Sequence, residues 1–207
     1  MTKNELMQRV HAAIDKRAAD IIRLGETIRR HPELGFKEFK TARLAEDTLR
    51  EMGLAPKGGL AITGVRADAI GRAGGGPTFA LLGELDGLVV PGHPFADPET
   101  GAAHACGHNA QVAGMLGAAM GLLDSKAFDH MAGRVAFIAV PAEEYGDVEW
   151  RVKQRNEGKL EFLGGKPEML RLGHLDDVDM AMMIHATPRP EEGKLAVPVS
   201  NNRCTVK

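Results

Sequence analysis

The densest cluster of side chains that could bind a metal ion is His104-Ala-Cys106-Gly-His108, between a long loop and a predicted helix. Thiolate and imidazole groups are good ligands for zinc and similar divalent ions. In extended backbone the side chains of Cys106 and His108 point the same way, and Gly107 lets the main chain come close to an ion. Taken alone, the pattern fits a buried structural cysteine beside a surface histidine about as well as a metal site.

Two adjacent carboxylates, Glu143 and Glu144, come directly after the apolar segment of residues 134–140. A generic pair of glutamates most often forms an acidic turn in solvent. Adjacent glutamates can also divide two tasks, since one binds a metal ion and the other accepts a proton from water. Their position favours the second interpretation, because open α/β sheets place their sites at the carboxyl ends of strands.

A third candidate, His185, follows the apolar segment of residues 178–184. A histidine at the end of an apolar strand is more often a structural group. Here the same logic places His185 at the sheet edge already predicted for Glu143 and Glu144. Three sets of candidate ligands at one edge outweigh the separate structural explanations, so we expect one site.

The elements that must position these side chains alternate between helices and apolar strands. Apolar residues at helical spacing predict helices at residues 5–30, 37–52, 109–123 and 167–172. Apolar runs predict strands at residues 62–70, 78–85, 134–140 and 178–184, the last two buried on both sides. A long loop rich in Pro, Gly and Asp spans residues 89–103. This order predicts an α/β fold, a three-layer α/β/α sandwich with helices on both faces of the sheet.

Composition excludes several classes of partner. The formal net charge of -2 gives no electrostatic reason to expect nucleic acid or an anionic membrane as a partner. No apolar run reaches the roughly 18 residues of a membrane span, and the amphipathic start lacks the apolar core of a signal peptide. Two cysteines in 207 residues do not make a disulfide framework. We therefore expect a reduced, cytoplasmic protein.

A Gly-rich segment, GRAGGGP at residues 71–77, raises the alternative of a nucleotide-binding domain. It lies between two predicted strands and not between a strand and a helix. Its amides therefore do not form the helix start that binds phosphate, and we reject this alternative.

Four segments, in this order, resemble the M20 amidohydrolases, and in particular the branch with aminobenzoyl-glutamate, indoleacetyl-amino-acid and N-acyl-amino-acid hydrolases. They are HPELGFKEFKTA (31–42), HACGHNAQVAGMLGAA (104–119), VPAEEYG (140–146) and GGKPEMLRLGHLDDVDMAMMIHATP (164–188). The resemblance implies a catalytic domain of the zinc-peptidase type with four metal ligands, Cys106, His108, Glu144 and His185. It also implies Glu143 as the general base and Asp86 as a supporting residue beside the site.

The resemblance further implies two divalent ions, zinc or manganese with cobalt or nickel as alternatives, and hydrolysis of a small-molecule amide such as an N-acyl amino acid. Members of this family run to about 400 residues, a size that implies two domains, and the resemblance implies a homodimer at full length. We expect residues 1–199 to be the N-terminal part of the catalytic domain. Residues 200–207 would begin an inserted lid and dimerisation domain that is largely missing. The 207-residue chain alone would then lack useful amidase activity.

Two departures from the family pattern keep another possibility open. Asn109 stands where most of this branch has Asp, so a carboxylate has become a neutral amide. An extra polar stretch at residues 149–161 fits a loop near the cleft or a solvated surface equally well. Asn109 and the missing C-terminal half favour an alternative, a non-catalytic fragment or paralogue that keeps the fold and binds metal or ligand without turnover. The five residues Cys106, His108, Glu143, Glu144 and His185 oppose it, since a protein without this function has no need for them together.

Overall fold

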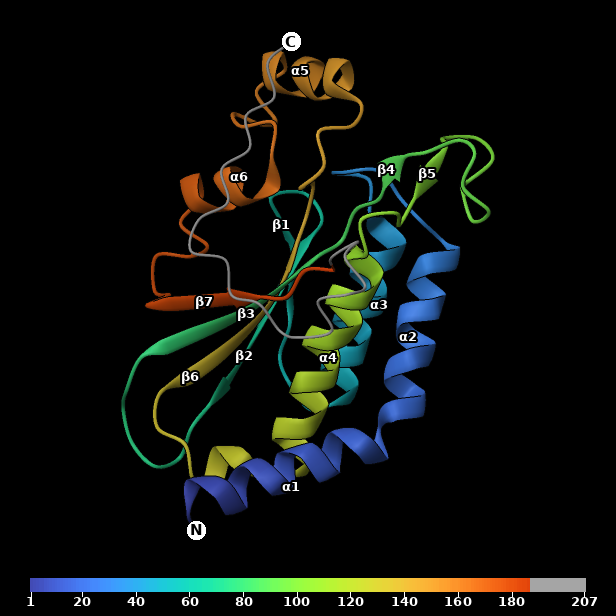
Figure 1. The fold of residues 1–207 in the computed structure, drawn as a ribbon. Coiled ribbons are helices and arrows are strands. Elements are labelled where there is room, and N and C mark those ends of the chain that lie inside the picture. Colours follow the sequence, from blue (N-terminus) through green and yellow to red (C-terminus); the bar gives the residue numbers. More distant parts are fainter. Residues whose placement is uncertain (187–207) are drawn as a thin grey trace.

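A mixed five-stranded sheet forms the centre of the computed structural model, which describes residues 1–186 (Figure 1). The strands are β1 (Lys57–Leu60), β2 (Gly64–Ile70), β3 (Thr78–Glu84), β6 (Arg134–Val140) and β7 (Met180–Met183), in the order β1-β2-β6-β3-β7. Strand β3 runs parallel to both β6 and β7, whereas β1 and β2 are antiparallel to their neighbours. The carboxyl ends of three adjacent strands, β6, β3 and β7, therefore lie at one edge of the sheet.

One face of the sheet is covered by α3 (Phe39–Glu51) and α4 (His108–Asp124), and α2 (Ala18–Arg30) packs on α4 (Figure 1). Side chains of β6 alternate between the two faces of the sheet, as strand geometry requires. Phe137 points to this face and joins Leu49 of α3 and Leu116 of α4 in the main hydrophobic core.

The opposite face is covered by a thinner layer. Ile138 and Val140 of β6 pack there with Met169, which is fully buried in α6 (Gly165–Arg171). Helix α5 (Val148–Asn156), which precedes α6 in the chain, lies farther from the strands than α6, at the top of Figure 1. Helices on both faces of the sheet make the predicted three-layer α/β/α sandwich.

The small residues of α4 let its neighbours approach closely. A Cβ at Gly117 would lie 2.8 Å from Cδ1 of Ile21 in α2, and a Cβ at Gly121 would overlap Ile14 of α1 (Lys3–Lys16). On the other side, a Cβ at Gly83 of β3 would lie 3.0 Å from Cα of Val112. Helix α4 is thus locked between the sheet and the N-terminal helices, which fixes its first residue, His108.

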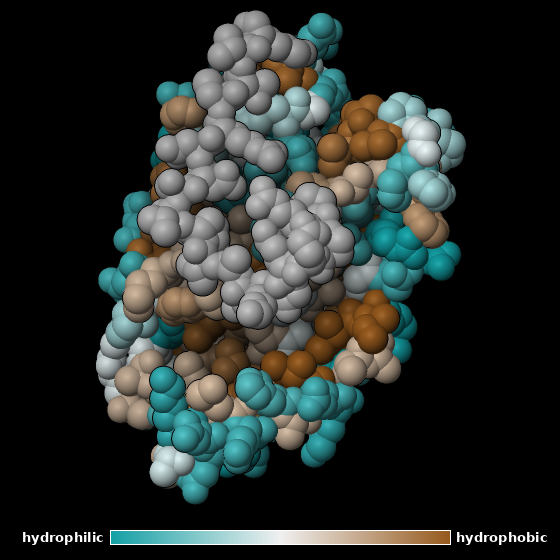
Figure 2. Space-filling view, in the orientation of Figure 1, coloured by the Kyte–Doolittle hydropathy of each residue, from teal (hydrophilic) through white to brown (hydrophobic). Residues whose placement is uncertain are grey.

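The prediction of one helix over residues 5–30 was wrong, because the chain breaks at Arg17 into α1 and α2. Helix α1 crosses the end of α4 while α2 runs beside it (Figure 1), and the Arg17 Nε donates to Asp124 Oδ2 at 2.7 Å. The break lets both helices bury their apolar sides on α4. No Pro or Gly marks it, so helical spacing alone could not reveal it. The outer side of α1 is mostly hydrophilic (Figure 2).

The strand predicted at residues 178–184 exists as β7, but the expectation that it is buried on both sides was wrong. Met180 and Met182 are 49% and 52% exposed. Within residues 1–186, β7 pairs with β3 alone and forms an edge of the sheet. A run of apolar residues does not distinguish an edge strand from a central one.

Three shorter elements also differ from expectation. The segment Lys57–Leu60 forms β1, which was not predicted, and two residue pairs of the long loop form the small ladder of β4 (Leu88–Val89) and β5 (Ala102–Ala103). The polar stretch at residues 149–161 contains α5. The expected start of a lid domain at residues 200–207 lies outside the described residues. No helix within residues 1–186 combines the length and apolarity needed to cross a bilayer.

Candidate metal centre

The carboxyl ends of the three parallel strands bring the candidate residues together. Glu84 is the last residue of β3, Glu143 and Glu144 follow the end of β6 after a Pro-Ala pair, and His185 follows β7. The start of α4 supplies the remaining two candidates: Cys106 lies two residues before the helix, His108 is its first residue, and Gly107 lies between them at φ 87°. That left-handed conformation suits glycine and turns the chain into α4.

Two groups of side chains bring possible ligand atoms close together. Cys106 Sγ lies 3.3 Å from His185 Nε2, and His108 Nε2 lies 3.8 Å from Glu143 Oε2 and 3.9 Å from Glu144 Oε1. Zinc bonds to sulfur and nitrogen of about 2.3 and 2.0 Å place two ligand atoms of one ion roughly 3 to 3.6 Å apart, so the first distance lies in the range of a shared ion and the other two are slightly longer. The five residues expected at one sheet edge therefore lie together.

His108 is oriented by Asp86. Its Nδ1 lies 2.7 Å from the main-chain oxygen of Asp86 and 3.3 Å from the Asp86 carboxylate. In the neutral imidazole, with Nδ1–H donating to Asp86, Nε2 carries a lone pair that points into the cluster, which is the arrangement of most metal-binding histidines. An imidazolium must first release its Nε2 proton to bind a metal. Asp86 Oδ2 also accepts from the main-chain N–H of Glu144 at 2.9 Å. Asp86 thus ties together a candidate ligand on α4 and another after β6.

Glu84 is a member of the cluster that the sequence analysis missed. Its side chain is 1% exposed, its Oε2 lies 2.9 Å from His108 Nε2, and its Oε1 accepts from Lys166 Nζ. With His108 and Glu143 it forms a second possible set of metal ligands beside Cys106, His108 and His185. One signal could have found it: strand alternation puts Glu84 on the same side as Asp86, two residues later.

The charges of the cluster are strongly coupled. Burial disfavours charge on His108, but hydrogen bonds with Asp86 and Glu84 outweigh it and raise the pKa of the imidazole to about 11. Burial also opposes charge on Glu84, yet His108 and Lys166 lower the pKa of this carboxyl to about 2. Burial and the Glu84 charge raise the pKa of Glu143. A raised pKa suits a carboxylate that accepts a proton near neutral pH.

The residues present fit a divalent ion. Glu84 Oε2 and His108 Nε2 are buried and face each other at 2.9 Å, and neither has another hydrogen-bond partner among the described residues. A divalent cation would accept a lone pair from each of these atoms in place of the His108 proton. Burial and the neighbouring Glu144 raise the pKa of the Cys106 thiol to about 11, so the thiol must release a proton to bind a metal. The mixture of sulfur, nitrogen and oxygen donors suits zinc, manganese or cobalt.

The turn that carries Glu143 and Glu144 is strained and tightly held. Ala142 has φ 50°, a left-handed conformation that costs a non-glycine residue about 1–3 kcal/mol and persists only where its surroundings impose it. The Ala142 N–H donates to Glu38 Oε1 at 2.7 Å, and its carbonyl accepts from Gly165 N at 3.0 Å. Helices α3 and α6 therefore fix this turn from two sides.

Asn109 and His104 belong to the same sequence motif as Cys106 and His108, but their side chains have other surroundings than the candidate ligands. Asn109 donates from Nδ2 to the Gly25 carbonyl of α2 at 3.2 Å, so its amide serves the packing of α2 on α4. His104 is buried, and neither of its ring nitrogens has a hydrogen-bond partner among the described residues. Burial lowers the pKa of its imidazole to about 4.

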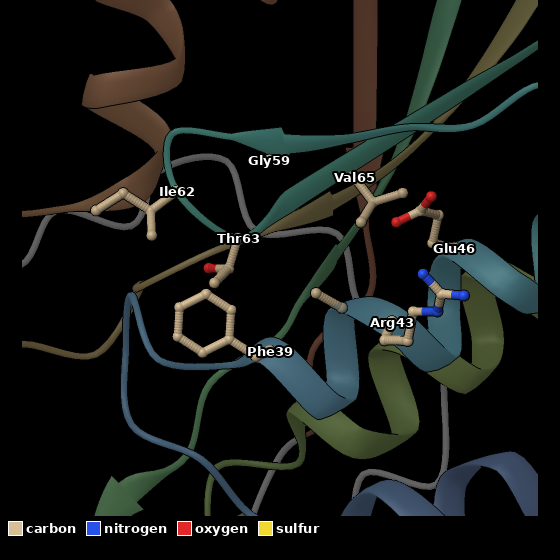
Figure 3. Close-up of a pocket in the computed structure, with 8 residues that line it drawn as sticks. Phe39, Arg43, Glu46, Gly59, Ile62, Thr63 and Val65 are labelled. Atoms are coloured by element: carbon tan, nitrogen blue, oxygen red, sulfur yellow. The ribbon is translucent and has the colours of Figure 1, made fainter.

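A hollow of about 240 Å³ lies between α3 and the β1–β2 turn (Figure 3). Phe39, Arg43 and Glu46 of α3 face Gly59, Ile62 and Val65 across it. None of the candidate ligands lines this hollow, so it is separate from the candidate metal centre.

Known proteins with similar sequences and structures share this arrangement of elements. The chain is 31% identical over 179 residues to thermostable carboxypeptidase 1 of Saccharolobus solfataricus, covering 85% of this chain and 41% of the relative. It is 30% identical over 200 residues to an N-acyl-L-amino acid amidohydrolase of Geobacillus stearothermophilus, covering 95% of this chain and 48% of the relative. The chain thus spans less than half the length of these curated relatives.

Among solved structures, the YXEP protein of Bacillus subtilis, a dinuclear metal-binding peptidase of the M20 family, matches with a TM-score of 0.65 and 29% identity. The match covers 82% of this chain and 43% of that protein. The family model of peptidase family M20/M25/M40 matches residues 80–207, which include every candidate ligand. The chain belongs to peptidase family M20/M25/M40.

Proposed function

We propose that this protein is a metal-dependent hydrolase that cleaves the amide bond of small N-acyl amino acids or similar conjugates. The observation that carries the proposal is the convergence of Cys106, His108 and His185 with the carboxylates of Glu143 and Glu144 at one sheet edge. The names of the relatives support the substrate class, since one of them is an N-acyl-L-amino acid amidohydrolase.

In this proposal Cys106, His108, Glu144 and His185 hold two divalent ions, and Glu84 is a further candidate ligand. Bound ions supply Lewis acidity, which lowers the pKa of a water molecule and polarises the carbonyl of the substrate. Asp86 fixes the tautomer of His108 and the main chain of Glu144 through the contacts described above. It therefore acts as a positioning residue.

Glu143 is proposed as the general base. Its carboxylate is half-buried, close to His108 and linked to the strained turn after β6. It takes a proton from the attacking water and then passes that proton to the nitrogen of the leaving amine. Both transfers need a group whose pKa lies near the working pH, and burial together with the Glu84 charge shifts the pKa of Glu143 upward, in that direction.

Amine release from a panel of N-acyl amino acids tests the proposal. Aminobenzoyl-glutamate and indoleacetyl amino acids complete the panel, and manganese, zinc or cobalt is added to metal-free protein. We expect metal-dependent release by a full-length version of the protein, a loss of release in its Glu143→Gln variant, and no useful release by the 207-residue chain alone. Release that does not depend on added metal, or that persists in Glu143→Gln, would contradict the proposal.

A further inference from the structure

The largest fully buried side chain among residues 1–186 is a charged one, Arg151 of α5. Its Nη2 donates to the main-chain carbonyl of Glu144 at 2.6 Å, and its Nη1 donates to the carbonyl of Leu163 at 2.8 Å. A polar helix on the surface thus sends a guanidinium beneath the turn that carries the proposed base and one proposed ligand. Burial of an arginine is unusual unless it is paired.

The hydrogen bond from Arg151 is the second one that holds the main chain of Glu144. The N–H of Glu144 donates to Asp86, and its carbonyl accepts from Arg151. Because the main chain is held on both sides of Cα, the position of the carboxylate depends on both partners. Groups that support metal ligands in this way commonly change metal affinity when they are removed.

Arg151 also offsets buried negative charge. Glu38 and Asp86 are both fully buried, and burial together with the Asp86 charge raises the pKa of Glu38. The charge of Arg151 interacts favourably with both carboxylates. Without this cation, the two acids behind the turn would lose a compensating charge in a region of low dielectric.

The surroundings are shaped for a guanidinium. The Cζ of Arg151 lies 5.3 Å from the Phe36 ring and 5.9 Å from the Tyr145 ring, within the range of cation–π contacts. A Cβ on Gly35 would overlap Nη2. A lysine has one donor group at its end and cannot make both carbonyl contacts with the same geometry.

We propose that Arg151 is a positioning residue that sets Glu144 for metal binding, so that α5 controls the affinity of the metal centre. The inference rests on the proposed function, since it takes Glu144 as a ligand. The simpler interpretation is that Arg151 only anchors α5 to the domain. The two interpretations predict different metal affinities for a folded Arg151 variant: the affinity falls if Arg151 positions Glu144, and it is unchanged if Arg151 only anchors α5.

The experiment measures manganese and zinc affinity of metal-free protein by competition with a chromogenic chelator. It compares wild type, Arg151→Met, Arg151→Lys and the control Arg155→Met, which removes an exposed arginine from the same helix. We expect Arg151→Met to weaken binding about 10- to 100-fold, Arg151→Lys to fall between it and wild type, and Arg155→Met to match wild type. Circular dichroism identifies which variants are folded.

Wild-type affinity in folded Arg151→Met or Arg151→Lys, even with a lower melting temperature, would overturn the inference and leave the proposed function intact. If Arg151→Met does not fold, the Arg151→Lys comparison decides alone. Absence of metal binding by the wild-type protein would overturn both the inference and the proposed function. Partial recovery of affinity when low millimolar guanidinium is added to folded Arg151→Ala would support the inference further.

Discussion

At the scale of single residues, the site depends on side chains whose two polar atoms each contact a different partner. His108 directs Nδ1 to Asp86 and Nε2 into the cluster, and Glu84 directs one oxygen to Lys166 and the other to His108. A ligand held in this way loses little freedom when an ion binds. Glu143 and Glu144, which are proposed to act as base and ligand, also differ in their contacts. Asp86 accepts a hydrogen bond from the main chain of Glu144 and not from that of Glu143.

Substitution of each glutamate separates the two proposed roles. Glu143→Gln should keep metal binding and lower turnover about 100-fold or more, because the proton acceptor is lost. Glu144→Gln should lower metal occupancy, because a neutral amide is a weaker ligand than a carboxylate. Metal analysis of the purified variants, together with amine release, makes the comparison. The reverse pattern would exchange the two assignments.

The raised pKa of Glu38 predicts how the stability of the protein depends on pH. Burial and the Asp86 charge raise the pKa of Glu38 from 4.5 to about 7 in the folded protein. A raised carboxyl pKa means that the folded state prefers the protonated form, so its contribution to stability is complete below about pH 4.5 and is lost as pH rises through 7. Glu38→Gln resembles the protonated form, since its amide oxygen can still accept from the Ala142 N–H. The Thr63 hydroxyl, which donates to Glu38 Oε2 in the structure, would instead accept from the glutamine amide.

The free energy of unfolding in urea, measured at pH 5 and pH 8, checks this. Relative to wild type, Glu38→Gln should become more stable as pH rises, by up to about 3 kcal/mol between the two limits. Taking the difference between the two proteins removes the contribution of other titrating groups. A difference that is independent of pH would show that Glu38 titrates normally.

Only some residues of the site could be predicted from the sequence. Cys106, His108 and His185 are rare types at the ends of apolar elements, so their positions predicted a site. Glu84 and Arg151 are common charged types, and only contacts with distant parts of the chain bury them. No local pattern distinguishes such residues from those of a solvated surface.

At the scale of elements, α6 and the turn after β6 depend on each other. Gly165, the first residue of α6, donates its N–H to Ala142. A Cβ at this position would overlap the main-chain oxygen of Pro141. The contact is with backbone, so it cannot be relieved by a side-chain rotation.

Gly165→Ala should therefore destabilise the protein by about 1–3 kcal/mol, the usual range for overpacking, and should weaken metal binding through the displaced turn. Gly75→Ala is the matched control, since a Cβ there meets nothing within 4 Å, and it should stay within about 0.5 kcal/mol of wild type. Thermal or urea unfolding of both variants provides the measurement. Equal stability of the two would show that α6 is not docked as described.

Most elements could be predicted because each had a clear period and end signals, as with His31-Pro32 after α2 and Gly53 after α3. The errors have one physical source. The break at Arg17 and the exposed edge at β7 are decided by which elements pack nearby. Helical spacing and apolar runs in a sequence indicate that a side chain is buried. They do not indicate which helix or strand buries it.

At the scale of the whole molecule, the candidate centre combines four segments spread from residue 84 to residue 185. It can form only when β3, β6 and β7 are parallel neighbours and α4 begins at their carboxyl ends. The sheet order is therefore the feature that converts four separate motifs into one site. Family membership and fold agree with this arrangement over the described part of the chain.

The most direct test is a cobalt titration of metal-free protein followed by visible absorption. A thiolate bound to cobalt gives a charge-transfer band, so the wild-type protein should show this band with saturable binding. Cys106→Ser should lose the band, whereas Cys204→Ser, which removes the only other cysteine of the sequence, should keep it. A band that survives Cys106→Ser, or wild-type protein that binds no cobalt, would contradict a metal centre built on Cys106.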